Sequence, residues 1–143
     1  IVELVARPVH EDVFGFDLKP MNAVKMTKRD LNEELTTTQM NRIYDNPNSF
    51  GRTYGAHRAF LELDDQAHYE VYKFAKEKRL DFIETLCAKG CLSMLKLFTP
   101  DYLKVASRDL TNLPLLSVMA ETKIPIILST GMQVRKNWMM RWK

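Results

Sequence analysis

Several features that would assign this chain to a special class are missing from its 143 residues. No apolar stretch approaches the roughly 20 residues that cross a bilayer. The first residues, IVELVARP, lack the basic and apolar regions of a secretory signal peptide. The chain also lacks an initiator Met, which fits a start inside a longer one. These absences predict a protein without a membrane partner.

Cysteine and histidine are scarce. The only two cysteines, Cys87 and Cys91, are too few for a disulfide-stapled fold, and they fit a reducing, cytoplasmic location. Two thiols alone do not complete a metal site, so the pair predicts buried thiols on a helix. The three histidines, His10, His57 and His68, are scattered and give little support to a metal site of three histidines.

Charge of one sign does not dominate. The 21 Lys and Arg residues face 18 Asp and Glu residues, and both signs are interspersed, as in KEKR at 76–79. A nucleic-acid-binding surface normally clusters its basic residues. Only the tail over 135–143 is one-sidedly basic, so we expect no nucleic-acid partner. The hydrophobic fraction of 45% predicts a globular chain of about one domain.

Short apolar runs recur, each typical of a strand covered on both faces. They lie at 1–5, 22–26, 81–86, 102–106 and 124–128. Helical patterns separate the later runs. One helix begins at Asp64 or Asp65 and ends near Arg79, a shorter one covers 88–97, and a third begins near Asn112 with Pro114 in its first turn. The first of these helices carries an inward apolar stripe of Ala67, Val71, Phe74 and Ala75.

The last three strands follow one another at intervals of about 20 residues, which is the βα repeat of a parallel sheet. This α/β pattern leaves two architectures open: an open doubly wound sheet, or a (β/α)8 barrel that has been cut, since a whole barrel needs about 250 residues. Two stretches break the rhythm. Residues 6–21 are a poor helix where a crossover belongs, and 27–63 form a long insertion of the kind that usually carries function.

Candidate site residues lie near the carboxyl ends of the strands, where parallel α/β sheets bind ligands. They are Glu3, Lys25, Thr85, Lys104, Ser107, Ser129 and Thr130. Two ammonium groups and several hydroxyls suit a phosphate or carboxylate ligand, and Glu3 is a carboxylate that could move a proton. The alternatives are lysines that reach solvent, hydroxyls that cap helices and a solvated Glu3. The chain contains no P-loop or Rossmann glycine fingerprint.

Three stretches resemble the N-acetylneuraminate (sialic acid) synthase family. They read NPNSFGRTYGAHR at 46–58, KVASRDLTNLP at 104–114 and PIILSTGM at 125–132. The runs that hold Lys25 and Glu3 are similar to the family's second and first barrel strands. The resemblance covers about 1–5 and 22–132, with its motifs in the right order and spacing.

The resemblance implies a fold and a reaction. The fold is a partial TIM (β/α)8 barrel over 1–132, with about five βα units and parallel strands, then an atypical tail over 133–143 without the C-terminal antifreeze-like domain. The reaction joins phosphoenolpyruvate to N-acetylmannosamine and gives sialic acid and phosphate, in a homodimer that uses Mn²⁺ or another divalent metal. The histidine ligands of that metal are not present in this chain. We therefore expect a truncated chain of doubtful activity alone.

Two alternatives stay open beside that reaction. One is a non-catalytic remnant of the barrel that binds an anion or a partner chain. The other is a related legionaminate- or pseudaminate-type synthase, although the loop NSFGRTYG resembles the sialate branch more. Metal dependence and phosphate release would separate the enzyme from the remnant.

Matched position by position, the resemblance assigns roles to residues. Phosphoenolpyruvate binding falls to Lys25, Thr85, Lys104, Ser107 and Ser129, proton transfer to Glu3, and a sugar contact to Asn48. The chain departs from the family at Thr27, where Gln is common, at Arg108, where Gly is usual, and at Glu84. The carboxylate of Glu84 would repel an anionic substrate unless it points away.

Overall fold

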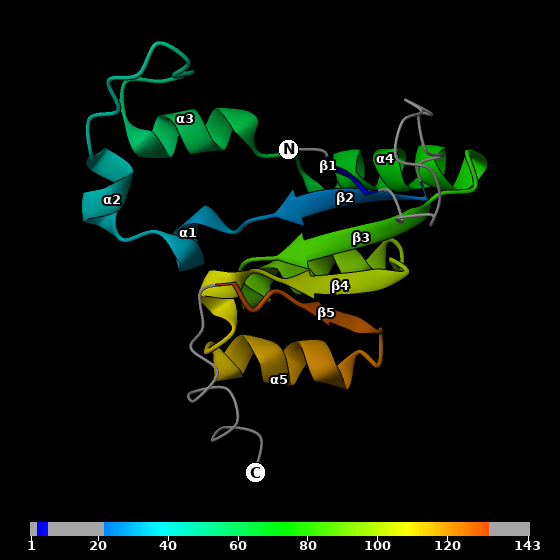
Figure 1. The fold of residues 1–143 in the computed structure, drawn as a ribbon. Coiled ribbons are helices and arrows are strands. Elements are labelled where there is room, and N and C mark those ends of the chain that lie inside the picture. The colour runs from blue at the N-terminus through cyan, green and yellow to red at the C-terminus, as the bar shows by residue number, and fades with distance from the viewer. Residues whose placement is uncertain (1–2, 6–21, 132–143) are drawn as a thin grey trace, which may run out of the picture.

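The computed structural model describes the backbone of residues 3–5 and the whole of residues 22–131. Five strands form one sheet in which the spatial order is the chain order (Figure 1). The strands are β1 (Glu3–Val5), β2 (Ala23–Lys28), β3 (Asp81–Leu86), β4 (Tyr102–Val105) and β5 (Ile126–Leu128). Each lies within or beside a run that the sequence predicts, and β2 extends two residues past the prediction. The expected tail over 133–143 lies outside the described residues.

Strands β2 to β5 are parallel, as the βα repeat predicts. The first strand is an exception, because β1 pairs antiparallel with β2 and places Glu3 opposite Lys25. The prediction that all strands are parallel is wrong for β1. A parallel partner needs a crossover connection, usually a helix, whereas an antiparallel partner needs only a reversal of the chain. The sequence between β1 and β2, with Pro8, Gly15 and Pro20, is a poor helix former.

The core lies between one face of the sheet and three helical elements. These are α4 (Asp65–Glu77), the 3₁₀-helix η1 (Lys89–Lys96) and α5 (Leu113–Glu121). Asp64 and Asn112 cap α4 and α5, since their side chains accept from the backbone N–H groups of Ala67 and Leu115. The residues buried from the sheet include Met26, Phe82, Leu86, Leu103 and Val105. Both long helices therefore begin where the sequence predicts.

The shorter helix predicted over 88–97 is present as the 3₁₀-helix η1, which contains Gly90 and Ser93, both weak α-helix formers. The inward stripe predicted for α4 is wrong at one position. In α4, Phe74 is 58% exposed, whereas His68 is 1% exposed and takes the inward place. A histidine can occupy that place because β3 supplies a partner for its ring, as described below.

The long insertion after β2 contains three short helices rather than an open loop. They are α1 (Leu31–Glu34), α2 (Thr37–Asn41) and α3 (Tyr54–Leu61). Each is capped by a side chain of the preceding residue: Asp30 caps α1, Thr36 caps α2 in a capping box with Gln39, and Thr53 caps α3. The helices follow the carboxyl end of β2 and extend beyond the sheet there (Figure 1).

The end of α4 supports a stability prediction. Arg79 lies in the left-handed region with φ 58°, and the N–H groups of Leu80 and Arg79 donate to the carbonyls of Ala75 and Lys76, at N–O distances of 2.9 and 3.0 Å. This is a Schellman motif, whose left-handed position favours glycine. Arg79→Gly should raise the free energy of unfolding by about 0.5–1 kcal/mol, measured by urea denaturation.

A matched control is Lys78→Gly. Lys78 ends the same helix with φ −83°, where glycine relieves no strain. That variant should be less stable than the wild type. A loss of stability in Arg79→Gly as well would contradict the prediction.

Candidate functional site

The alternation of side chains along the strands sorts polar residues onto two faces. On β3, Phe82, Glu84 and Leu86 face the helices, so Ile83 and Thr85 face the opposite side. The neighbouring strands follow the register, which sets Thr85 beside Thr27 of β2 and beside Lys104 of β4. Paired residues of adjacent strands share a face. The face away from the helices therefore carries a row of two hydroxyls and a lysine, and Lys25 lies on the same face two residues before Thr27.

Lys25 and Lys104 are close enough to influence each other. Burial lowers the pKa of Lys25, and the positive charge of Lys104 lowers it further. Two neighbouring ammonium groups repel, and an anion between them would relieve that repulsion. The structure thus brings together three of the residues that the sequence predicts to bind phosphoenolpyruvate.

The Thr85 hydroxyl is buried without a hydrogen-bond partner in the described part of the chain. Thr85 is 5% exposed, and its Oγ1 atom has no hydrogen-bond partner among the described residues. Buried hydroxyls without a partner are rare, because such a group has lost its contacts with water and gained none in return. The hydroxyl shares its face with Lys104 and is suited to donate to an anion.

The four remaining predicted residues are Ser107, Ser129, Asn48 and Glu3. Ser107 begins η2 (Ser107–Asp109), which is separated from β4 by Ala106 alone, and Ser129 follows β5, where its N–H donates to the carbonyl of Val105. Both therefore lie at the carboxyl edge. Asn48 is exposed in the turn between α2 and α3, which projects away from the strand ends (Figure 1). The side chain of Glu3 lies outside the described part of the structure.

Glu84 points away from the predicted anion site. Its Oε2 lies 2.9 Å from Nδ1 of His68, and the side chains are 0% and 1% exposed. Burial raises the pKa of Glu84, and the hydrogen bond with His68 opposes only part of that rise. The departure from the family at this position therefore places a carboxylate in the core, on the helix side of the sheet.

The structure reveals charged residues that sequence reasoning missed. Arg29, just after β2, and Arg108, in η2, both contact Oε1 of Glu34, from Nη1 at 2.5 Å and from Nη2 at 2.6 Å. The sequence could have indicated both arginines as candidate site residues, because each lies shortly after a strand. It could not have indicated their pairing with Glu34 of α1, because nothing in the local sequence relates α1 to η2.

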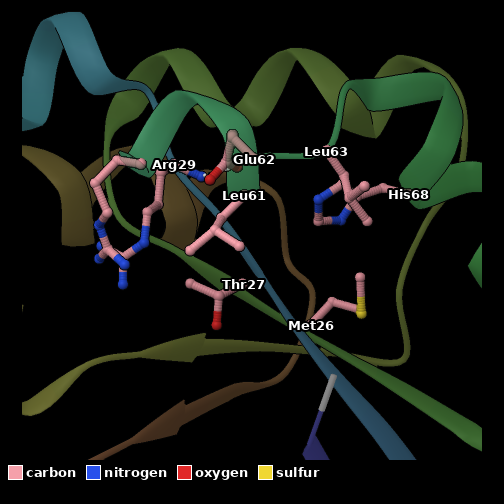
Figure 2. A pocket seen from close by; sticks show the side chains of 8 residues that line it. Met26, Thr27, Arg29, Leu61, Glu62, Leu63 and His68 are labelled. Atoms are coloured by element: carbon pink, nitrogen blue, oxygen red, sulfur yellow. Dashed lines mark hydrogen bonds between the residues drawn. The ribbon is translucent and has the colours of Figure 1, made fainter. Parts of the chain in front are cut away.

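A cavity of about 40 Å³ lies beside the end of β2. Figure 2 shows Arg29 beside Glu62 on one side and Leu63 and His68 on the other, with Thr27 and Met26 of β2 below them. The N–H of Arg29 donates to Oε1 of Glu62 at 2.8 Å. The space suits a few water molecules rather than a sugar.

No metal centre is formed by residues 3–5 and 22–131: no group of three or more His, Cys, Asp or Glu side chains there could hold a metal ion. Cys87 and Cys91 are buried and free, as predicted, but only Cys91 lies in a helix, because Cys87 directly follows β3. Within the same residues, no helix combines the length and apolarity that a membrane span requires.

The fold and the site define an α/β protein whose parallel strands carry cationic and hydroxyl side chains on one face and at their carboxyl edge. A family model described as the NeuB family matches residues 19–140, and the chain belongs to this family. The sequence-based resemblance is therefore confirmed.

Similar proteins give this result more detail. The chain is 31% identical over 112 residues to an N-acetylneuraminate-9-phosphate synthase of Drosophila melanogaster and 28% identical to that of Homo sapiens. Each match covers 78% of this chain but only 30% and 31% of the relatives, so the chain spans about a third of their length. It is also 33% identical over 72 residues to an N,N'-diacetyllegionaminic acid synthase of Legionella pneumophila, covering 50% of this chain and 20% of that protein.

A solved structure shares the fold. The crystal structure of N-acetylneuraminic acid (sialic acid) synthetase from Leptospira borgpetersenii serovar Hardjo-bovis in complex with citrate matches with a TM-score of 0.63 and 23% sequence identity. The match covers 83% of this chain and 37% of that one. The predicted α/β architecture, a partial TIM-barrel-like synthase fold, is confirmed.

The buried pair of Glu84 and His68 supports a prediction about pH. Because the pKa of Glu84 is raised in the folded state, this group makes stability fall as pH rises above the ordinary carboxyl pKa of 4.5. Glu84→Gln removes that titration and keeps an acceptor for His68. In urea titrations from pH 4.5 to 7, the variant should lose less stability than the wild type. At pH 7 its free energy of unfolding should be equal to that of the wild type or up to about 1 kcal/mol higher.

Glu70→Gln is the matched control on α4. Glu70 is exposed, and its hydrogen bond with Lys73 lowers its pKa, so its removal should change the pH dependence little and in the opposite sense. Parallel pH profiles for wild type and Glu84→Gln would contradict the prediction.

Proposed function

We propose that this chain provides the phosphoenolpyruvate-binding part of a sialic acid synthase-type enzyme. The enzyme would join phosphoenolpyruvate to N-acetylmannosamine, or a related N-acetylhexosamine, and release phosphate. One observation carries the proposal: Lys25, Thr85 and Lys104 share one face of three adjacent strands, and the buried Thr85 hydroxyl lacks a partner in the described part of the chain. Membership of the NeuB family and the names of the relatives support it.

The residue types suit the chemistry of phosphoenolpyruvate. Its carboxylate and phosphate are anionic, so two ammonium groups would offset most of its charge, and charge-assisted hydrogen bonds are the strongest that a site can offer. Ser107 and Ser129 at the carboxyl edge would add hydroxyl donors. The partly buried position of Lys25 strengthens its attraction to an anion, because nearby solvent screens it less.

In the proposed reaction, C3 of phosphoenolpyruvate forms a bond to the aldehyde carbon of the open-chain sugar. Water adds at C2, and the C–O bond to phosphate then breaks, so phosphate leaves with the bonding electrons. Lys25 and Lys104 would hold the phosphate and carboxylate and stabilise the charge on the leaving group. Glu3 would assist proton transfer and Asn48 would contact the sugar. Mn²⁺ or another divalent metal remains part of the proposal for the whole enzyme, as do a cytoplasmic location and a homodimer.

A second candidate is an anion-binding protein without catalysis. Two observations favour it. The lysines and hydroxyls that could bind an anion lie together on the sheet, whereas Asn48, the predicted sugar contact, lies in a turn that projects away from the strand ends. Phosphate release in the presence of phosphoenolpyruvate, N-acetylmannosamine and Mn²⁺ separates the two candidates.

The proposal predicts stabilisation by ligand. Millimolar phosphoenolpyruvate should raise the Tm of the 143-residue chain, since a ligand at about 100 times its Kd adds about 2.7 kcal/mol to the stability of the folded state. Lys104→Ala should lose this rise, because it removes one of the two ammonium groups. Differential scanning calorimetry with and without ligand measures both.

Lys96→Ala is the control, because Lys96 is an exposed lysine of η1, on the helix side of the sheet. It should keep the full rise in Tm. A wild type that phosphoenolpyruvate does not stabilise, or an equal rise in Lys104→Ala, would show that the proposal is wrong.

A further inference from the structure

Arg108 reaches across the end of a neighbouring strand. It follows β4, whereas Glu34 and Arg29 follow β2, and β3 lies between these two strands in the sheet. Nevertheless, Nη2 of Arg108 lies 2.6 Å from the same oxygen of Glu34 that Arg29 contacts. The contact between Arg108 and Glu34 therefore spans the carboxyl end of β3, where Thr85 is the second-to-last residue of the strand.

Electrostatics at the end of β3 agree with this path. Cys87 is the first residue after β3 and lies two residues after Thr85. Burial raises the pKa of its thiol, the positive charges of Arg29 and Arg108 oppose that rise, and the negative charges of Glu34 and Asp109 add to it. Both guanidinium groups thus act on Cys87 at the end of β3, two residues after Thr85.

Arg108 retains donors for a ligand. Its Nε donates to Oδ2 of Asp109 at 3.2 Å and its Nη2 to Glu34, whereas its Nη1 has no partner among residues 22–131. The side chain is 42% exposed, compared with 8% for Glu34. A guanidinium group that is fixed on one edge and open on the other is suited to bind a phosphate or carboxylate.

We propose that Arg108 is an additional anion-binding residue of this site, contacting the phosphate or carboxylate of phosphoenolpyruvate, and that Glu34 is the positioning residue that holds it across the end of β3. The inference rests on the proposed function. It goes beyond the resemblance, because the family usually has glycine at the position of Arg108. Arg108 would add a guanidinium donor beside the two ammonium groups, while Arg29 helps to offset the charge of Glu34, with which both arginines pair.

Calorimetric titration with phosphoenolpyruvate tests the role of Arg108. Arg108→Ala should raise the Kd about 10- to 100-fold, the loss expected for a charge-assisted hydrogen bond. Arg108→Lys should recover part of the affinity, because it restores charge but not a planar pair of donors. Arg108→Gln, which keeps the length and polarity of the side chain, should bind as weakly as Arg108→Ala and serves if that variant unfolds. Arg79→Gly removes an arginine before β3, at the opposite edge of the sheet, and should leave the Kd unchanged.

A double-mutant cycle tests the role of Glu34. Glu34→Gln should weaken binding severalfold when Arg108 is present and should have no further effect in the Arg108→Ala background. A purely structural role for Glu34 would produce the same loss in both backgrounds, and that result would overturn the positioning role.

The outcomes distinguish this inference from the proposed function. If Lys104→Ala loses phosphoenolpyruvate binding while Arg108→Ala and Arg108→Gln bind as the wild type does, the inference is wrong and the proposed function stands. If the wild type itself does not bind phosphoenolpyruvate at 10 mM, roughly a hundred times a typical substrate Kd, both are wrong. Weak binding by all the Arg108 variants except Arg108→Lys, with Arg79→Gly unchanged, supports the inference.

Discussion

The register between β3 and β4 is the constraint on which the rest of this structure depends. It sets Thr85 beside Lys104, and the alternation of side chains then determines the surroundings of every other strand residue. A shift of one residue would bury Lys104 among the helices and expose Leu103 and Val105. The burial of those two apolar side chains therefore also holds the lysine on the opposite face. The pairing of β3 with β4 therefore sets both the buried core and the positions of the predicted anion-binding residues.

The same alternation explains a carboxylate in the core. Glu84 lies between Phe82 and Leu86 on the helix face, where an isolated charge would be costly. His68 of α4 offsets part of this cost through a hydrogen bond, and Lys28 acts on Glu84 from the end of β2. Lys28 in turn contacts Asp65 at the start of α4. These polar contacts join α4 to β2 and β3, and they keep the negative charge of Glu84 off the face that carries the lysines.

The long insertion after β2 contributes through its first helix. Asp30 caps α1, the cap sets the direction of the helix, and Glu34 at its end reaches the arginines that follow β2 and β4. A segment that is polar and poorly periodic in sequence thereby becomes part of the carboxyl edge. The exposed, stacked rings of Phe50 and Phe60 lie further out, in the part of the insertion that holds the turn with Asn48.

The sequence by itself determined the elements whose signals are local. Strands β2 to β5 follow from short apolar runs, and α4 and α5 follow from their caps and periodicity. The strand-end rule led to Lys104 and the hydroxyls near the carboxyl edge, whereas Lys25 lies three residues before the end of β2. The motifs also determined the family. These signals are readable because apolar spacing and capping depend on neighbours within a few residues.

Only the tertiary structure decided the rest. It set β1 antiparallel, turned His68 inward in place of Phe74, and joined Arg29, Glu34 and Arg108 across three strands. Each of these depends on which distant segment supplies a partner: a strand for β1, a carboxylate for His68, two guanidinium groups for Glu34. Partners so far apart leave no mark on local periodicity, because the energy that selects them exists only once the sheet has formed.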